Sequence, residues 1–129
     1  MTIFSKIIAG DIPCYKIAED EHYFAFLDIA PSAKGHTLVV PKIEIDYIFD
    51  LDDTLLAGMH IFAKKVAKAI EKSVACKRIG VAIIGLEVPH AHIHLIPINT
   101  MADMDFRKKI TISKEELQEI AEKIRENFV

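Results

Sequence analysis

Three of the six histidines in this chain stand at alternate positions, His90, His92 and His94, within the stretch PHAHIHLIP. Successive side chains of a β-strand point to opposite faces of the sheet, so these three would share one face, with neighbours about 7 Å apart. The apolar residues that alternate with them would then face the core: Ala91, Ile93 and Leu95.

Such a row of imidazoles has three interpretations. It can be a solvated sheet face, or a metal site, because neutral imidazole binds zinc and copper. However, His90 and His94 would lie about 13 Å apart along a straight strand, so one ion needs a bend or another ligand. The third interpretation is nucleotidyl transfer. One imidazole nitrogen attacks phosphorus, an acceptor holds its other N–H, and neighbouring histidines donate to phosphate oxygens. We favour the third, because it gives each histidine a role.

The elements that must position these histidines are predicted from periodicity. Strand-like stretches cover residues 15–19, 22–29, 36–41, 79–84 and 90–98. Apolar residues at helical spacing predict a short N-terminal helix that ends before Gly10, with the members Ile3, Phe4, Ile7 and Ile8. The chain is therefore expected to be α+β, with an antiparallel sheet of about five strands.

Two more helices are expected. The stripe of a long amphipathic helix runs through Leu55, Met59, Phe62, Val66 and Ile70, with Asp52 or Asp53 as its N-cap. The sequence Ser113-Lys114-Glu115-Glu116 has the form of a capping box and predicts a C-terminal helix. Its apolar face would carry Leu117, Ile120, Ile124 and Phe128.

Length and composition narrow the possible functions. A chain of 129 residues without repeats or linkers predicts a single domain over 1–129. The net charge of −3 gives no reason to expect nucleic-acid or membrane binding. Cys14 and Cys76 fit no metal or redox spacing, and no signal peptide or spanning segment is recognisable, so we expect a cytoplasmic protein.

The chain resembles the histidine triad (HIT) superfamily, in its Hint/Fhit-like branches of nucleotide hydrolases and transferases. HAHIHLI follows the pattern His-φ-His-φ-His-φ-φ, in which φ is apolar or small. The segments IFSKIIAGDIP, FAFLDIAPSAKGHTLVVPK and FDLDD also fall where such proteins have similar sequences. The resemblance is strongest over residues 2–98, which leaves 99–129 as a C-terminal extension with a helix.

The resemblance implies roles for individual residues. His92 would attack the α-phosphorus, His94 would hydrogen-bond phosphate oxygens, His90 would support the nucleophile, and His36 would pack beside the triad. Asp28 would accept hydrogen bonds from the ribose hydroxyls. The base pocket would be lined by Ile3, Phe4, Ile7 and Ile29. The resemblance also implies a nucleotide substrate, expected to be a purine nucleotide, no cofactor, and a homodimer formed through the long helix and the adjoining strand.

Several positions depart from the family pattern. Leu86 stands where a phosphate-contacting glutamine is common, and the preceding loop lacks the usual asparagine. Glu87 replaces a serine or threonine near the leaving group, where it could repel a polyphosphate or act as a general acid. Thr2 and Ser5 occupy positions that bind zinc through two cysteines in some relatives, and Glu44 replaces a frequent histidine. We therefore expect no metal.

These departures favour small leaving groups, such as the amine of a nucleoside phosphoramidate, over long dinucleoside polyphosphates. Two other functions stay open: a nucleotide-binding module with weak or no catalysis, and a histidine-metal enzyme. Residues 99–112 match the family poorly. They either fold over the site, where Arg107, Lys108 and Lys109 could bind phosphate, or simply lead to the final helix.

Overall fold

The computed structural model describes residues 1–128 and confirms the expected α+β class. Its centre is one five-stranded sheet in the order β1-β2-β3-β5-β4, and every neighbouring pair is antiparallel. The strands are β1 (Lys16–Glu19), β2 (Tyr23–Leu27), β3 (Thr37–Pro41), β4 (Arg78–Ala82) and β5 (Ile93–Ile98). All five are shorter than predicted, because bends and loops take over at the ends of the apolar runs.

All three expected helices are present: α1 (Ile3–Ile8), α2 (Asp53–Ser73) and α3 (Lys114–Asn127). Each begins with a side chain that accepts a free backbone N–H: Thr2, Asp52 and Ser113 cap them in that order. Two 3₁₀ turns, η1 (Ile48–Asp50) and η2 (Met101–Met104), lie in the connections. Within residues 1–128, no helix combines the length and the apolar character needed to cross a bilayer.

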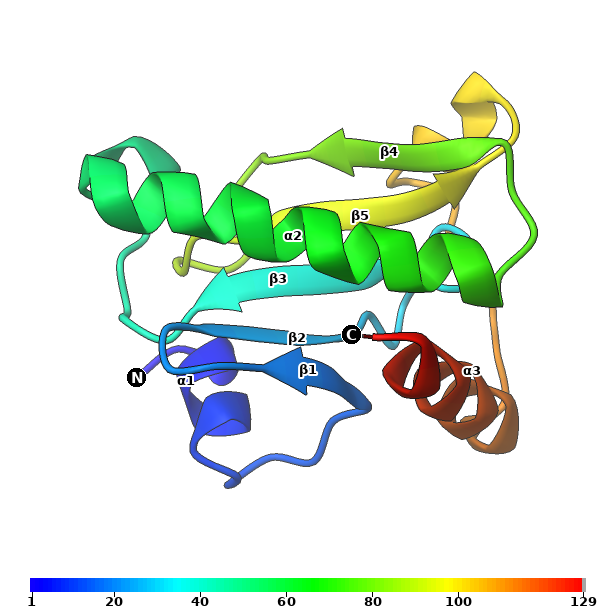
Figure 1. Ribbon diagram of the computed structural model, residues 1–129, viewed down its shortest axis with the longest axis horizontal. Coiled ribbons are helices and arrows are strands. Elements are labelled where there is room, and N and C mark those ends of the chain that lie inside the picture. The colour runs from blue at the N-terminus through cyan, green and yellow to red at the C-terminus, as the bar shows by residue number, and fades with distance from the viewer. Residues whose placement is uncertain (129) are drawn as a thin grey trace.

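The two faces of the sheet bury different sets of side chains. Helix α2 lies across one face, and α3 packs beside α2 and against β1 (Figure 1). The main core lies beneath them and includes the buried stripe of α2, Met59, Phe62, Val66 and Ile70. A smaller core on the opposite face contains Phe4, Phe24, Phe26, Leu38 and Val40. Helix α1 closes the end of this second core, beside the histidines.

The expectation that one strand holds all three alternate histidines is wrong. Strand β5 begins at Ile93, so His90 and His92 lie in the bent segment before it. The physical reason lies in β3, whose last residue is Pro41. Proline has no N–H to continue the ladder, and the carbonyl of Pro41 is hydrogen-bonded to the His90 ring instead of to a neighbouring strand. Ala91, Ile93 and Leu95 nevertheless face the main core, as expected.

Candidate functional site

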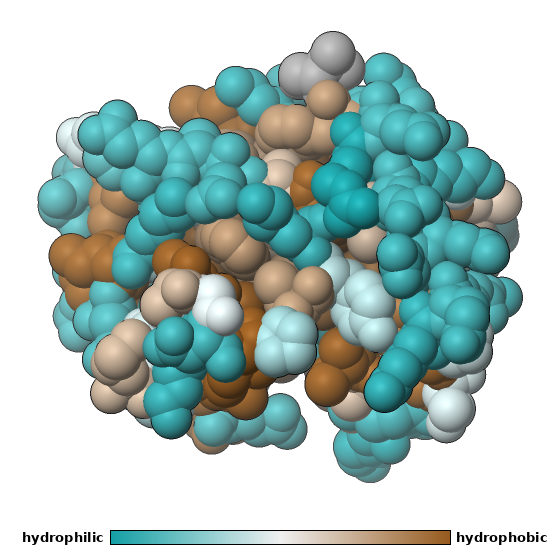
Figure 2. All heavy atoms as spheres, turned by 90° about the horizontal axis from the view of Figure 1, so that it is seen from below, coloured by the Kyte–Doolittle hydropathy of each residue, from teal (hydrophilic) through white to brown (hydrophobic). Residues whose placement is uncertain are grey.

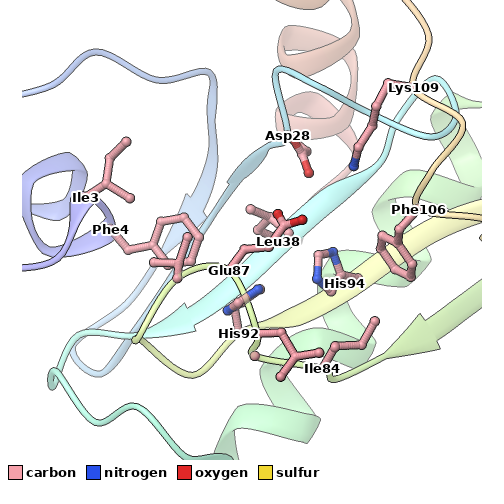
Figure 3. Close-up of a pocket in the computed structure, with 13 residues that line it drawn as sticks. Ile3, Phe4, Asp28, Leu38, Ile84, Glu87, His92, His94, Phe106 and Lys109 are labelled. Carbon is pink, nitrogen blue, oxygen red and sulfur yellow. The ribbon is translucent and has the colours of Figure 1, made fainter.

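A cavity of about 300 Å³ opens on the sheet face opposite α2, where the chain leaves β2 and enters β5. A notch with hydrophobic side chains on its walls is visible at the lower edge of the space-filling view (Figure 2). Eight of the residues singled out from the sequence line the cavity, and all but Leu86 are labelled in Figure 3: Ile3, Phe4, Asp28, Leu86, Glu87, His92, His94 and Lys109.

The tautomer of the neutral His92 ring is fixed by a hydrogen bond within its own segment. Its Nδ1 atom lies 2.7 Å from the carbonyl oxygen of His90. A carbonyl can only accept, so Nδ1 carries a proton, and in the neutral ring Nε2 keeps its lone pair. The ring of Phe4 packs edge-on against His92, with centroids 5.1 Å apart. The arrangement therefore fixes the tautomer and the orientation of the neutral imidazole and leaves Nε2 as the nitrogen without a protein partner among these contacts.

His94 is oriented by His36, which is fully buried behind it. The backbone N–H of Ser32 donates to His36 Nδ1 at 3.1 Å, so the proton of this ring must be on Nε2. His36 Nε2 lies 3.0 Å from His94 Nδ1, which therefore accepts. The proton of His94 is thus left on Nε2, where it can be donated to a ligand in the cavity.

His90 lies behind His92 and links the site to α1. Its Nε2–H donates to the carbonyl oxygen of Pro41 at 2.8 Å, so its Nδ1 accepts from the Thr2 hydroxyl at 2.8 Å. Glu44 in turn accepts from the Thr2 backbone N–H at 2.7 Å and from the Ser5 hydroxyl at 2.6 Å. Polar contacts between residues far apart in sequence therefore tie α1, which carries Ile3 and Phe4, to the histidine segment.

Burial decides the charge of these groups. Desolvation, assisted by repulsion from His94, Lys109 and His92, lowers the pKa of His36 to about 3. Desolvation and the charges of His92 and Lys109 lower the pKa of His94 to about 4. The pKa of His90 is also lowered by burial, against the effects of its bond to Pro41 and of Glu44. These three rings are therefore neutral at physiological pH, as the tautomers above require.

Comparison with known proteins places this arrangement in a family. Residues 9–101 match the family model of the HIT domain. The chain belongs to the HIT family. It is 45% identical over 97 residues to the adenosine 5'-monophosphoramidase hnt1 of Schizosaccharomyces pombe, with 74% of this chain and 72% of that protein covered. It is 43% identical over 102 residues to protein hit of Bacillus subtilis, with coverages of 74% and 69%.

A solved HIT-like protein confirms the fold expected from the resemblance. The protein, from Bartonella henselae and described as involved in cell-cycle regulation, aligns with a TM-score of 0.85 at 34% identity. The alignment covers 98% of this chain and 95% of that chain. The chain therefore has the HIT-like α+β fold along almost its whole length, including the residues beyond 101.

The structure places two of the base-pocket candidates away from the cavity of this HIT chain. Ile7 packs with the second core, and Ile29 is 71% exposed on the loop after β2. Asp28, just before Ile29, does face the cavity. Its Oδ1 accepts the Ala30 N–H at 2.9 Å, and burial raises the pKa of its carboxyl, an effect that this bond and the charge of Lys109 oppose.

Among the described residues, Asp28, His36 and His94 are the one group whose side-chain ligand atoms lie close enough together to hold a metal, within 4.8 Å of one another. The hydrogen bonds argue against such a use. An ion bound to His36 Nε2 would have to displace its proton, yet Nδ1 of the same ring already accepts from Ser32. Both nitrogens would then lack a proton, which a neutral imidazole does not allow. His36 and His94 are better explained as members of a hydrogen-bond chain that begins at the Ser32 N–H and fixes their tautomers.

Two residues of the C-terminal extension also line the cavity, Phe106 and Lys109. The Phe106 ring packs against His94 with centroids 4.7 Å apart. Of the three basic residues considered for phosphate, Arg107 pairs instead with Asp105 at 3.0 Å, and Lys108 lies outside the cavity lining. In the sequence, one aromatic and three basic residues at 106–109 indicated that this segment could take part in the site. Their spacing alone could not show which of the side chains faces the cavity.

Proposed function

We propose that this HIT chain is a nucleotide hydrolase or nucleotidyl transferase that cleaves nucleoside phosphoramidates at the α-phosphate. The observation that carries the proposal is the pair of tautomers beside the cavity. His92 offers an unprotonated Nε2 as a nucleophile, and His94 offers an Nε2–H as a donor to phosphate oxygen. The 45% identity to a protein named as an adenosine 5'-monophosphoramidase supports the same reaction class.

The first step forms a bond from His92 Nε2 to phosphorus while the bond from phosphorus to the leaving nitrogen breaks. We assign the proton that the departing amine needs to the carboxyl group of Glu87, which lies in the cavity wall. The imidazole becomes a nucleotidyl-imidazolium, whose Nδ1–H stays on the His90 carbonyl. His94 donates to a phosphate oxygen, where transition-state charge collects.

The second step releases the nucleotide. Water attacks phosphorus, the bond from phosphorus to Nε2 breaks, and the electron pair returns to His92. The proton lost by water passes to the Glu87 carboxylate, so the enzyme ends as it began. Asp28 holds the ribose hydroxyls through its carboxylate, and Ile3 and Phe4 form an apolar wall for a base, which we propose to be a purine.

Intact mass after brief mixing with adenosine 5'-phosphoramidate tests this proposal. Wild-type protein should gain one nucleoside monophosphate, and His92→Ala should gain none. A wild type that binds AMP but shows neither adduct nor released AMP would instead make the chain a binding module, consistent with the 89% exposed Leu86 in place of an amide donor. Retention of full activity after chelation and dialysis would exclude the histidine-metal alternative.

We further propose that the chain forms a homodimer through β4 and α2. Strand β4 is at the edge of the sheet, with unpaired backbone groups that invite addition of another strand. Large apolar side chains are exposed on both elements: Val81 on β4 is 57% exposed and Ile61 on α2 is 60% exposed. Such surfaces are typical of an interaction site.

A further inference from the structure

The segment of residues 101–110, which we call the strap, runs from the end of β5 across one side of the cavity. Three contacts fix it there. The Ser32 hydroxyl donates to the Asp103 carbonyl at 3.0 Å, and the Ile110 N–H donates to the Pro31 carbonyl at 2.9 Å. Between these anchors, Phe106 packs against His94 and, at 6.0 Å between centroids, against His36. The strap is therefore attached both to the loop after β2, which follows Asp28, and to the side chains of His36 and His94.

Lys109 extends from the strap into the cavity. Its amino group points toward the space between Asp28 and His94 (Figure 3). Its Nζ lies 5.7 Å from the centroid of the Phe106 ring, which limits the directions open to the side chain. Its positive charge acts on Asp28, His36 and His94 alike, which agrees with a position between the ribose side and the histidines.

The cavity needs such a charge. A nucleotide phosphate is anionic, yet the two other formally charged residues in the lining, Asp28 and Glu87, are acidic. Leu86, where many HIT relatives have a glutamine, offers no donor. Lys109 is, of the described residues that line the cavity, the one with a basic amine. It can offset the charge of the Asp28 carboxylate and donate to phosphate oxygen.

We propose that Lys109 binds a non-bridging oxygen of the nucleotide α-phosphate, so that the strap supplies the phosphate contact that position 86 does not. His94 Nε2–H takes the other non-bridging oxygen. The ligand class is a nucleoside 5'-monophosphate or its phosphoramidate. The assignment rests on the proposed function of the same site and adds a residue and a segment to it.

The test compares the affinities of AMP and of adenosine, measured by calorimetry, for wild type, Lys109→Met and Lys108→Met. Lys108 is a matched control because it is adjacent, exposed and outside the cavity lining. Lys109→Met should weaken AMP binding by roughly tenfold or more, the value of a charge-assisted hydrogen bond, and should leave adenosine binding unchanged. Lys108→Met should change neither, and Lys109→Arg should keep most of the AMP affinity.

Other outcomes separate the possible errors. If Lys109→Met weakens AMP and adenosine equally, Lys109 shapes the nucleoside pocket and the phosphate assignment is wrong. If it weakens neither ligand, the strap has no role in binding. A wild type that binds AMP in this pattern but never turns over the phosphoramidate overturns the hydrolase proposal alone. A wild type that binds neither ligand overturns both.

Discussion

Nε2 of His36 lies 3.0 Å from Nδ1 of His94, and this one contact decides which nitrogen of His94 carries a proton. The tautomer of His36 is itself fixed by the Ser32 N–H, which donates to its Nδ1. Each hydrogen bond in this series therefore points from the backbone toward the cavity. His36 is fully buried and does not line the cavity. It is therefore a positioning residue, which acts on a ligand only through His94.

Replacing His36 by methionine removes the Nε2–H donor, and the apolar methionine side chain still occupies the buried position. His94 would then be free to carry its proton on Nδ1, and the donor to phosphate would be lost in part. We expect kcat to fall by several-fold, with the roughly 10²-fold effect of removing one such donor completely as the upper bound, and KM to change little. His36→Gln should recover activity, because its amide N–H can take the place of Nε2–H.

Nitrogen-15 chemical shifts of His94 provide a readout that a purely structural role would not move. Wild type should show a protonated Nε2, His36→Met a mixture of tautomers, and His36→Gln the wild-type form. An unchanged His94 tautomer in a folded His36→Met protein would contradict the assigned role.

Acid should destabilise the fold well before the carboxylates titrate. The pKa values of His36 and His94 are about 3 and about 4 in the folded protein but about 6.5 when unfolded. Below pH about 6.5 the unfolded chain therefore binds more protons. The stabilisation is fully present above this pH and is lost as the pH falls toward the folded values. Each of the two groups contributes a slope of about 1.4 kcal/mol per pH unit.

Denaturant midpoints measured between about pH 7 and pH 4.5 check this expectation. The raised pKa of Asp28 acts with the opposite sign, because its contribution is lost as the pH rises through its folded value. It reduces the total slope without removing it. His36→Gln should reduce the slope of the free energy of unfolding against pH by the amount that corresponds to one proton. A free energy of unfolding that does not change over this pH range would rule out the neutral buried histidines.

The parts of the site that follow from local pattern were predictable, and those that depend on distant contacts were not. The helical stripe of α2 and the inward-facing Ala91, Ile93 and Leu95 follow from periodicity, which is a local property. The position of Lys109 depends on the bond between Ile110 and Pro31, and that of α1 on the contact between Thr2 and His90. Spacing along the chain carries no information about such pairs.

Glu87→Gln should affect substrates according to their leaving groups. If Glu87 protonates the departing atom, the variant should hydrolyse amine-leaving phosphoramidates about 10²- to 10⁴-fold more slowly. With a nucleotide ester of 4-nitrophenol, which leaves without a proton, the first step should release 4-nitrophenolate at close to the wild-type rate, and only the later hydrolysis of the nucleotidyl-histidine should slow. Single-turnover kinetics of the first step with both substrates decide the matter. An equal loss for both would assign Glu87 to binding rather than to proton transfer.

Charged substitutions on β4 and α2 should separate the proposed dimer. Val81→Glu and Ile61→Glu each place a carboxylate in the surface proposed for the contact, where burial without a partner costs several kcal/mol. We expect the combined variant to sediment as a folded monomer, while the wild type sediments as a dimer. Lys123→Glu on the exposed surface of α3, away from β4 and from Ile61, is a charge-changing control. A monomeric wild type at micromolar concentration would refute the proposal.

Gly58→Ala in α2 should lower stability, although alanine favours helices over glycine by about 1 kcal/mol. A Cβ atom at Gly58 would lie 2.3 Å from the Tyr23 hydroxyl oxygen, which donates to the Leu55 carbonyl at 2.8 Å. The ring would have to shift, breaking that bond and disturbing its packing with Phe62. In a Tyr23→Phe background the nearest ring carbon is 3.2 Å away, so the same change should be close to neutral or stabilising. Thermal unfolding of the four proteins in this cycle gives the answer, and a Gly58→Ala protein more stable than wild type would show that α2 and β2 can adjust around the added methyl group.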